Sequence, residues 1–272
     1  MTLVLSCATQ DYLVQACDRR LITNRGDLVD DNANKAVLFT NRLAFSYTGL
    51  ANIGSERTDL WLTKTLAALP TGSLSDAIRA VRSKATEAFK HISLPSGLKR
   101  HAFVGAGWTR ARVEEPLQPL LCLVSNFHDR QGETFAEDRD EFTTVVQILS
   151  SKNQLGFLAI GQALPGNRHT VLWRNLRRCA QHKVSPNLLV RFLVDEITEV
   201  SNSNKAVGRG ILSVVLPRSI ADSHEVVVVG GSPVPGMATF QYYPADRHDG
   251  IVYGPNVAGP GFGATNFRAG NL

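Results

Sequence analysis

Residues 1–51 read MTLVLSCATQ DYLVQACDRR LITNRGDLVD DNANKAVLFT NRLAFSYTGL A, and this stretch decides the fold. It contains four short apolar segments, which are residues 2–9, 12–17, 36–39 and 43–46. Polar residues interrupt the segments at Gln10 and around Asn41, and short apolar runs bounded in this way predict two β-hairpins. The first hairpin returns the chain to its start, so the charged residues 18–20 are expected close to Thr2.

Thr2 is a candidate nucleophile. A threonine hydroxyl is a weak nucleophile until a base takes its proton, and a free α-amine on the same residue can be that base. The amine has a reference pKa of about 7.7–8.0, so it accepts a proton near neutral pH. This chemistry requires the removal of Met1, which a small second residue commonly permits. Thr is also a frequent second residue in unrelated proteins, so Thr2 alone does not decide the function.

Three further residues of the same stretch fit this chemistry. Asp18 follows the second segment, Lys35 precedes the third and Gly49 follows the fourth. A lysine near the hydroxyl favours its deprotonated form, and an aspartate that bridges the two holds their geometry. A glycine at a strand end lets the backbone approach a substrate closely, and its N–H can serve as an oxyanion donor. The alternative is an ion pair of Asp18 and Lys35 that only holds the hairpins together.

At these residues the sequence resembles the catalytic β subunits of proteasomes and the peptidase subunit of bacterial two-component ATP-dependent proteases. The positions that match the family motif are Thr2, Asp18, Arg20, Lys35 and Gly49. Lys35 and Gly49 each fall one residue later than is commonest in that family. A single-residue insertion in the loop of residues 21–34 explains both shifts. The resemblance implies the N-terminal-nucleophile hydrolase fold, an α+β four-layer αββα sandwich of two antiparallel sheets. It also implies that Thr2, Asp18, Lys35 and Gly49 are catalytic.

The resemblance further implies where the substrate-binding pocket is formed. The corresponding positions are Arg20, Leu21, Thr23 and Tyr47. Arg20 is either a pocket cation that favours acidic substrates or the partner of a loop carboxylate, Asp30 or Asp31. We expect the ion pair, because a buried unpaired guanidinium would be costly. The pocket would then be neutral and of modest size.

Two family motifs are altered in this chain. The serine of a late Gly-Ser-Gly turn, which bonds the nucleophile's amine, is replaced by Gln162. The Asp-x-x-Ser-Gly-Gly motif aligns with residues 204–210, which read NKAVGRG. Candidates to replace the missing partners of the amine are the amides of Gln162 and Asn204 and the hydroxyls of Ser201 and Ser203.

The rest of the chain alternates between groups of helices and groups of strands. Leu62, Leu66 and Leu69 have helical spacing, and a second helix is expected to start at an N-cap within residues 73–75. Strands are expected at residues 101–108, 117–126, 142–149, 155–164, 212–216 and 225–229, and helices at 171–181 and 186–200. Such grouping predicts a layered α+β fold rather than alternating βαβ units.

The composition changes at residue 230. The following residues are rich in Gly and Pro and have neither helical nor strand periodicity. We therefore expect a hydrolase domain at 1–230 and a C-terminal extension at 231–272, which forms an extended arm or is poorly ordered. A phosphate loop at residues 261–263 is not expected, because no Lys-Ser/Thr follows.

Composition argues against several classes of function. The chain has 43% hydrophobic and 19% charged residues, and no run approaches the roughly 20 apolar residues of a membrane span. The N-terminal apolar run is too short for a signal peptide and lacks a basic flank, so we expect a cytoplasmic protein without a membrane partner. The net charge is +5, but acidic residues are interspersed, so nucleic-acid binding is not expected.

Cysteines and histidines give no sign of a metal site or cofactor. Cys7, Cys17, Cys122 and Cys179 are scattered and form no C-x-x-C pair, so they are expected to be buried small hydrophobes. His128 and His248 lie in polar segments and are expected at the surface.

Two functions therefore follow from the sequence. The first is a threonine-type peptidase or amidase that uses Thr2 after removal of Met1, with a peptide or other amide as substrate. The second is a non-catalytic relative with a structural, ring-forming role. For both, the resemblance implies a homo-oligomer, a ring or part of one, in which the clefts face an enclosed space. It does not say whether an ATPase is a partner.

Overall fold

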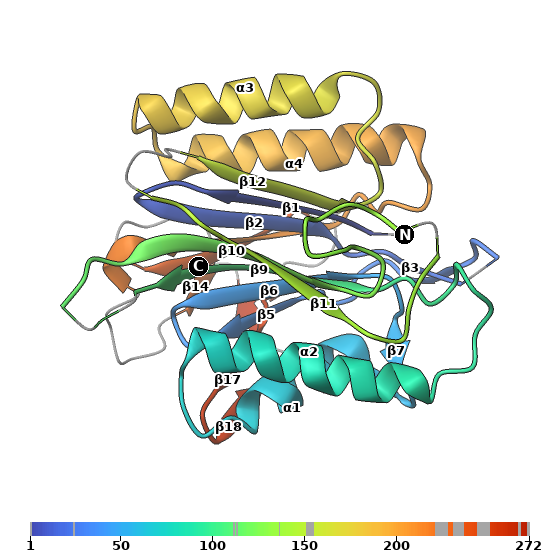
Figure 1. The fold of residues 1–272 in the computed structure, drawn as a ribbon. Helices are drawn as coiled ribbons and strands as arrows, with labels where there is room; N and C mark the ends of the chain where they lie inside the picture. The colour runs from blue at the N-terminus through green and yellow to red at the C-terminus, as the bar shows by residue number, and fades with distance from the viewer. Residues whose placement is uncertain are drawn as a thin grey trace.

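The chain folds into four layers, two β-sheets packed face to face between two layers of helices (Figure 1). The computed structural model describes all residues except 1, 24, 111, 113, 136, 151–154, 221–227, 231–236, 244–250, 266–267 and 271–272. It describes only the backbone of residues 220, 228–230, 251–253 and 268–270. The α+β sandwich predicted for the chain is confirmed.

The elements follow the predicted order of strands, helices, strands, helices and strands. The helices are α1 (Thr58–Ala67), α2 (Leu74–Lys90), α3 (Arg168–Gln181) and α4 (Pro186–Ser203), with a short 3-10 turn at Arg218–Ile220. The strands are β1 (Leu3–Ala8), β2 (Tyr12–Asp18), β3 (Leu21–Ile22), β4 (Leu28–Asp30), β5 (Ala36–Phe39), β6 (Leu43–Thr48), β7 (Asn52–Ile53), β8 (Glu56–Arg57), β9 (Ala102–Thr109), β10 (Gln118–Ser125), β11 (Thr143–Ile148), β12 (Gly156–Gly161), β13 (Ile211–Pro217), β14 (Val228–Gly230), β15 (Ala238–Tyr243), β16 (Ile251–Tyr253), β17 (Asn256–Gly259), β18 (Phe262–Ala264) and β19 (Arg268–Gly270).

In the described part of the chain the two large sheets have the orders β12-β1-β2-β13-β15-β14 and β11-β10-β9-β6-β5-β17-β18. Neighbouring strands are antiparallel except for the pairs β14 with β15 and β17 with β5. The β1–β2 hairpin pairs Val4 with Cys17 and lies in the middle of the first sheet. Thr2 precedes β1 and Asp18 ends β2, so both residues lie at the same end of this sheet.

Alternation along the first hairpin explains why both faces of its sheet are buried. Leu3, Leu5 and Cys7 pack against α3 and α4, whereas Val4 and Ala8 pack against the second sheet. Successive side chains of a strand point to opposite faces, so an unbroken apolar strand fits a layer that is covered on both sides. The second sheet is likewise covered by α1 and α2 (Figure 1).

The helix boundaries follow from their capping residues. Ser73 is the N-cap of α2, and its hydroxyl accepts a hydrogen bond from the N–H of Asp76. Ser185 caps α4 in the same way, and Pro186 occupies the first turn, where a missing N–H costs nothing. The N-cap predicted within residues 73–75 is confirmed.

The expectation that residues after 230 lack strand structure is wrong for the described ones. β15 pairs with β13 in the first sheet, and β17 pairs with β5 in the second. Tyr242 of β15 places its ring 4.7 Å from the guanidinium of Arg19 and donates a hydrogen bond to Asn32. The C-terminal stretch therefore contributes to both sheets; a domain boundary at residue 230 stays a prediction.

The burial of the cysteines is confirmed, whereas the surface position of His128 is wrong. All four thiols are buried. His128 is only 7% exposed, because its Nδ1 hydrogen-bonds to the Ser125 hydroxyl at 2.8 Å and its ring packs against Phe127. His248 lies outside the described residues.

Candidate active site

Thr2, Asp18 and Lys35 form one hydrogen-bonded group, in which Lys35 contacts both of the other side chains. The Lys35 ammonium donates hydrogen bonds to the Thr2 hydroxyl at 2.6 Å and to Asp18 Oδ1 at 3.3 Å, and also to the carbonyl of Arg20. All three side chains are buried. Asp18 ends β2 of the first sheet and Lys35 directly precedes β5 of the second, so the site joins the two sheets.

Asp18 is surrounded by donors. Its Oδ2 accepts the N–H of Leu3 at 2.7 Å. Its Oδ1 accepts the N–H groups of Arg20 at 3.0 Å and Gly208 at 3.1 Å in addition to the Lys35 ammonium. These hydrogen bonds replace the hydration that a buried carboxylate loses. Asp18 thereby fixes the start of β1, next to Thr2, relative to Lys35.

The electrostatics of Lys35 suit a role at the nucleophile. Burial lowers the pKa of its ammonium, and the neighbouring Asp18 carboxylate opposes that shift. A positive charge 2.6 Å from the Thr2 hydroxyl favours the deprotonated oxygen. The arrangement can therefore activate a hydroxyl nucleophile.

The main chain of Thr2 is held from the opposite side. Its carbonyl accepts the N–H of Gln162 at 3.0 Å and the hydroxyl of Thr48 at 3.2 Å. Gly161 has φ +105°, and a Cβ at this position would lie 1.8 Å from the Thr2 carbonyl oxygen. Only glycine fits this position. The contact of Thr48 was not predicted, although its position directly before Gly49 is a sequence signal for it.

Gly49 comes close to the chain before β9. It has φ +114°, and a Cβ would lie 2.2 Å from the carbonyl oxygen of Arg100. Among the described residues none accepts a hydrogen bond from its N–H. The tight packing that requires glycine here is therefore against the protein's own chain, and the free N–H is the feature of Gly49 that fits an oxyanion donor.

A cleft of about 390 Å³ opens beside Thr2. Its lining includes the predicted residues Arg20, Leu21, Thr23 and Gly49. It also includes residues without a sequence signal, namely Ile22, Leu50, Ala51, Gly97, Leu98 and Arg100. Tyr47, which was predicted to contact substrate, does not line this cleft; it is buried on the helix-facing side of β6, and its hydroxyl donates to the Asn34 carbonyl.

Arg20 pairs with Asp31, as expected. Its Nε lies 2.7 Å from Oδ1 and its Nη2 lies 2.8 Å from Oδ2 of the carboxylate. This bidentate geometry is the strongest form of the Arg–carboxylate pair. The cation at the edge of the cleft is therefore neutralised within the same loop.

Comparisons with known proteins address the fold. No protein-family model matches the sequence, and no curated protein matches it. Among solved structures, the (Gly-1) mutant of Anbu from Hyphomicrobium sp. strain MC1 is similar, with a TM-score of 0.51 and 16% sequence identity over 80% of this chain and 82% of that chain. The fold is the N-terminal-nucleophile hydrolase sandwich.

Within this N-terminal-nucleophile hydrolase fold, two of the altered motif positions contact the site only through their backbone N–H groups. Gln162 uses its N–H, and Gly208 binds Asp18 through its own N–H. Asn204 accepts the N–H of Ala206, and the hydroxyls of Ser201 and Ser203 donate to carbonyls of their own helix. In the described part of the chain these side chains make no hydrogen bond to Thr2.

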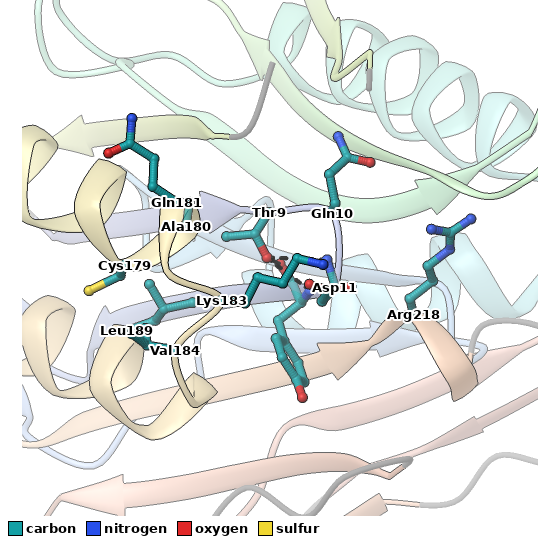
Figure 2. A pocket seen from close by; sticks show the side chains of 11 residues that line it. Thr9, Gln10, Asp11, Cys179, Ala180, Gln181, Lys183, Val184, Leu189 and Arg218 are labelled. Atoms are coloured by element: carbon teal, nitrogen blue, oxygen red, sulfur yellow. Dashed lines mark hydrogen bonds between the residues drawn. The ribbon is translucent and has the colours of Figure 1, made fainter. Parts of the chain in front are cut away.

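A second cavity of about 350 Å³ lies at the far end of the first hairpin (Figure 2). The six residues of β1 separate it from Thr2 by about 20 Å. Figure 2 shows that Lys183 and Arg218 reach it from different elements, the turn after α3 and the segment after β13. Its one thiol, Cys179, is not activated, because burial raises the thiol pKa. The cavity beside Thr2 is therefore the better candidate for catalysis.

No group of three or more His, Cys, Asp or Glu side chains in the described ranges is arranged to hold a metal ion. Across those ranges no helix combines the length and apolarity needed to cross a bilayer.

Proposed function

We propose that the chain is a threonine-type N-terminal-nucleophile hydrolase that cleaves peptide or other amide bonds with Thr2 after removal of Met1. The single observation that carries this proposal is the 2.6 Å hydrogen bond from the Lys35 ammonium to the Thr2 hydroxyl, inside a buried group that also contains Asp18. The free N–H of Gly49 at the same cleft supports it.

The proposed reaction proceeds through an ester. The Thr2 Oγ attacks the amide carbonyl carbon while its proton passes to the free α-amine of Thr2. The N–H of Gly49 stabilises the negative oxygen of the tetrahedral intermediate. The C–N bond then breaks, the leaving nitrogen takes the proton from the α-amine, and water hydrolyses the acyl-Thr2 ester.

The alternative is a non-catalytic relative. The observation that favours it is the local bonding of Asn204, Ser201 and Ser203, which leaves none of these side chains on Thr2. A chain that retains Met1 would also be non-catalytic, because Thr2 would lack a free amine.

Mass spectrometry tests the proposal directly. The intact mass should show that Met1 has been removed, and treatment with a peptide β-lactone should add one acyl group that maps to Thr2. Thr2→Ala should abolish labelling and amide hydrolysis without unfolding the protein, whereas Thr9→Ala, a threonine at the far end of β1, should leave both unchanged. Retention of Met1, or normal turnover by Thr2→Ala, would contradict the assignment.

We extend the proposal to assembly. The resemblance implies a homo-oligomeric ring, because an exposed site that cleaves amides generally would endanger other cytoplasmic proteins. Native mass spectrometry should show a single closed oligomer. A monomer at micromolar concentration would overturn this part of the proposal and leave the chemistry at Thr2 open to its own test.

A further inference from the structure

His101 is a buried histidine outside the Thr2–Asp18–Lys35 group. It directly precedes β9 and has no exposed surface. Its ring lies among aromatic side chains, with centroid distances of 4.6 Å to Phe103, 5.5 Å to Phe89 and 5.9 Å to Tyr47. Burying a polar ring in such surroundings costs free energy unless its nitrogen atoms form hydrogen bonds.

The Nδ1 atom of His101 holds the turn that follows β6. It accepts the backbone N–H of Leu50 at 3.0 Å. A Cβ on Gly49 would lie 2.8 Å from the His101 Cα and 2.9 Å from Nδ1, so the two residues are in close contact. Because Nδ1 is an acceptor here, the neutral ring carries its proton on Nε2, which has no partner among the described residues.

His101 is itself fixed by the backbone on its other side. Its N–H donates to Asn126 Oδ1 at 2.8 Å, and its carbonyl accepts the Asn126 N–H at 3.2 Å. The Asn126 amide also donates to the carbonyls of Lys99 and Arg139. The ring is therefore a rigid support for the Gly49–Leu50 turn.

We infer that His101 is a positioning residue for the proposed oxyanion donor: by binding the N–H of Leu50, it fixes the turn so that the neighbouring N–H of Gly49 stays free beside Thr2. The inference rests on the proposed function. The N–H of Leu50 would then be bound within the protein, whereas the N–H of Gly49 would be left for the substrate.

The role requires a neutral ring. An imidazolium has no acceptor, and it would turn an N–H toward the N–H of Leu50. Burial lowers the pKa of His101 to about 3, so the acceptor is present at physiological pH.

Two variants of nearly identical shape test this role. Asn and Leu both replace the imidazole with a smaller branched group, but only Asn retains an acceptor atom close to the position of Nδ1. We expect His101→Leu to lower kcat by about 10- to 100-fold with little change in KM, since an oxyanion donor acts in the transition state. His101→Asn should recover most of that loss, and its melting temperature should be close to that of His101→Leu.

Two further measurements separate the outcomes. A peptide vinyl sulfone adds to the Thr2 hydroxyl without forming a tetrahedral oxyanion, so its labelling rate should be similar in the two variants. Hydrogen exchange measured by mass spectrometry, which needs no activity, should be faster at Leu50 in His101→Leu than in the wild type and His101→Asn. Equal kcat in the two variants together with equal exchange at Leu50 would overturn the inference. A wild type that does not react at Thr2 would instead overturn the proposed function, and exchange would still report on the hydrogen bond.

Discussion

Asn34 and Asn256 are 222 positions apart in the sequence, and their side chains are joined by a 2.8 Å hydrogen bond from Nδ2 of Asn34 to Oδ1 of Asn256. Asn256 opens β17, and Asn34 immediately precedes Lys35. The amide of Asn256 also donates to Asp59 at 3.3 Å and to Thr63 at 3.1 Å. A buried polar network thus connects the C-terminal stretch and α1 with the chain that carries the proposed catalytic lysine.

Substitution of Asn256 by Leu should destabilise the protein. The change removes one buried hydrogen-bond partner each from Asn34, Asp59 and Thr63, and we expect the free energy of unfolding to fall by about 3 kcal/mol. Urea denaturation measures this loss. The matched control is Asn187→Leu, an exposed position on α4, which should change stability by less than about 0.5 kcal/mol. Equal stability of the two variants would show that the network contributes nothing.

Lys35→Met distinguishes a catalytic from a purely structural role of the Lys35–Asp18 pair. Met has similar length and no charge, so it removes the hydrogen bond to the Thr2 hydroxyl. We expect kcat to fall at least about 100-fold per folded molecule with KM changed less than about threefold, because Lys35 acts on the nucleophile rather than on bound substrate. Stability should also fall by about 3 kcal/mol, since Asp18 loses its buried partner.

The control is Lys84→Met, an exposed lysine on α2. It should change neither activity nor stability. Activity of Lys35→Met that declines only in proportion to the fraction of folded protein would support the structural role alone.

The sequence predicted the parts of the site that depend on strand order and missed those that depend on strand length and long-range pairing. The predicted fourth segment ends at residue 46, so the prediction did not include the alternation of side chains at residues 47 and 48. β6 continues to Thr48, so Tyr47 faces the helices whereas Thr48 faces Thr2. The missed β17 is short and contains a buried Asn256, and its pairing with β5 is set by tertiary contacts that no local periodicity records.

Asp31 should control how the cleft treats acidic substrates. Its carboxylate pairs with both the Nε and Nη2 of Arg20, which lines the cleft. Asp31→Asn releases that cation, so we expect the ratio of kcat/KM for peptides with Asp before the cleaved bond to that for peptides with Asn to rise by about 3- to 10-fold. The pair is partly exposed, so stability should change by less than about 1 kcal/mol.

Asp27→Asn is the matched control for Asp31. Asp27 lies in the same loop and bonds Thr23 rather than Arg20, so its substitution should leave the ratio unchanged. An acidic preference that is already present in the wild type and is lost in Arg20→Ala would contradict a neutralised Arg20.

His101 should make the protein sensitive to acid. Burial lowers the pKa of His101 to about 3, below its ordinary value of 6.5, and so in this interval the unfolded chain binds a proton that the folded chain does not. Stability from this residue is complete above pH 6.5 and is lost as the pH falls toward 3. The rings around His101 carry no group that ionises in this window, since burial raises the pKa of Tyr47 well above its usual value. Between pH 7 and pH 4.5 the wild type should therefore lose roughly 2–3 kcal/mol more of its unfolding free energy than His101→Asn, which has no titrating ring. Urea denaturation of both proteins at the two pH values measures this difference, and parallel losses would show that His101 is not held neutral by burial.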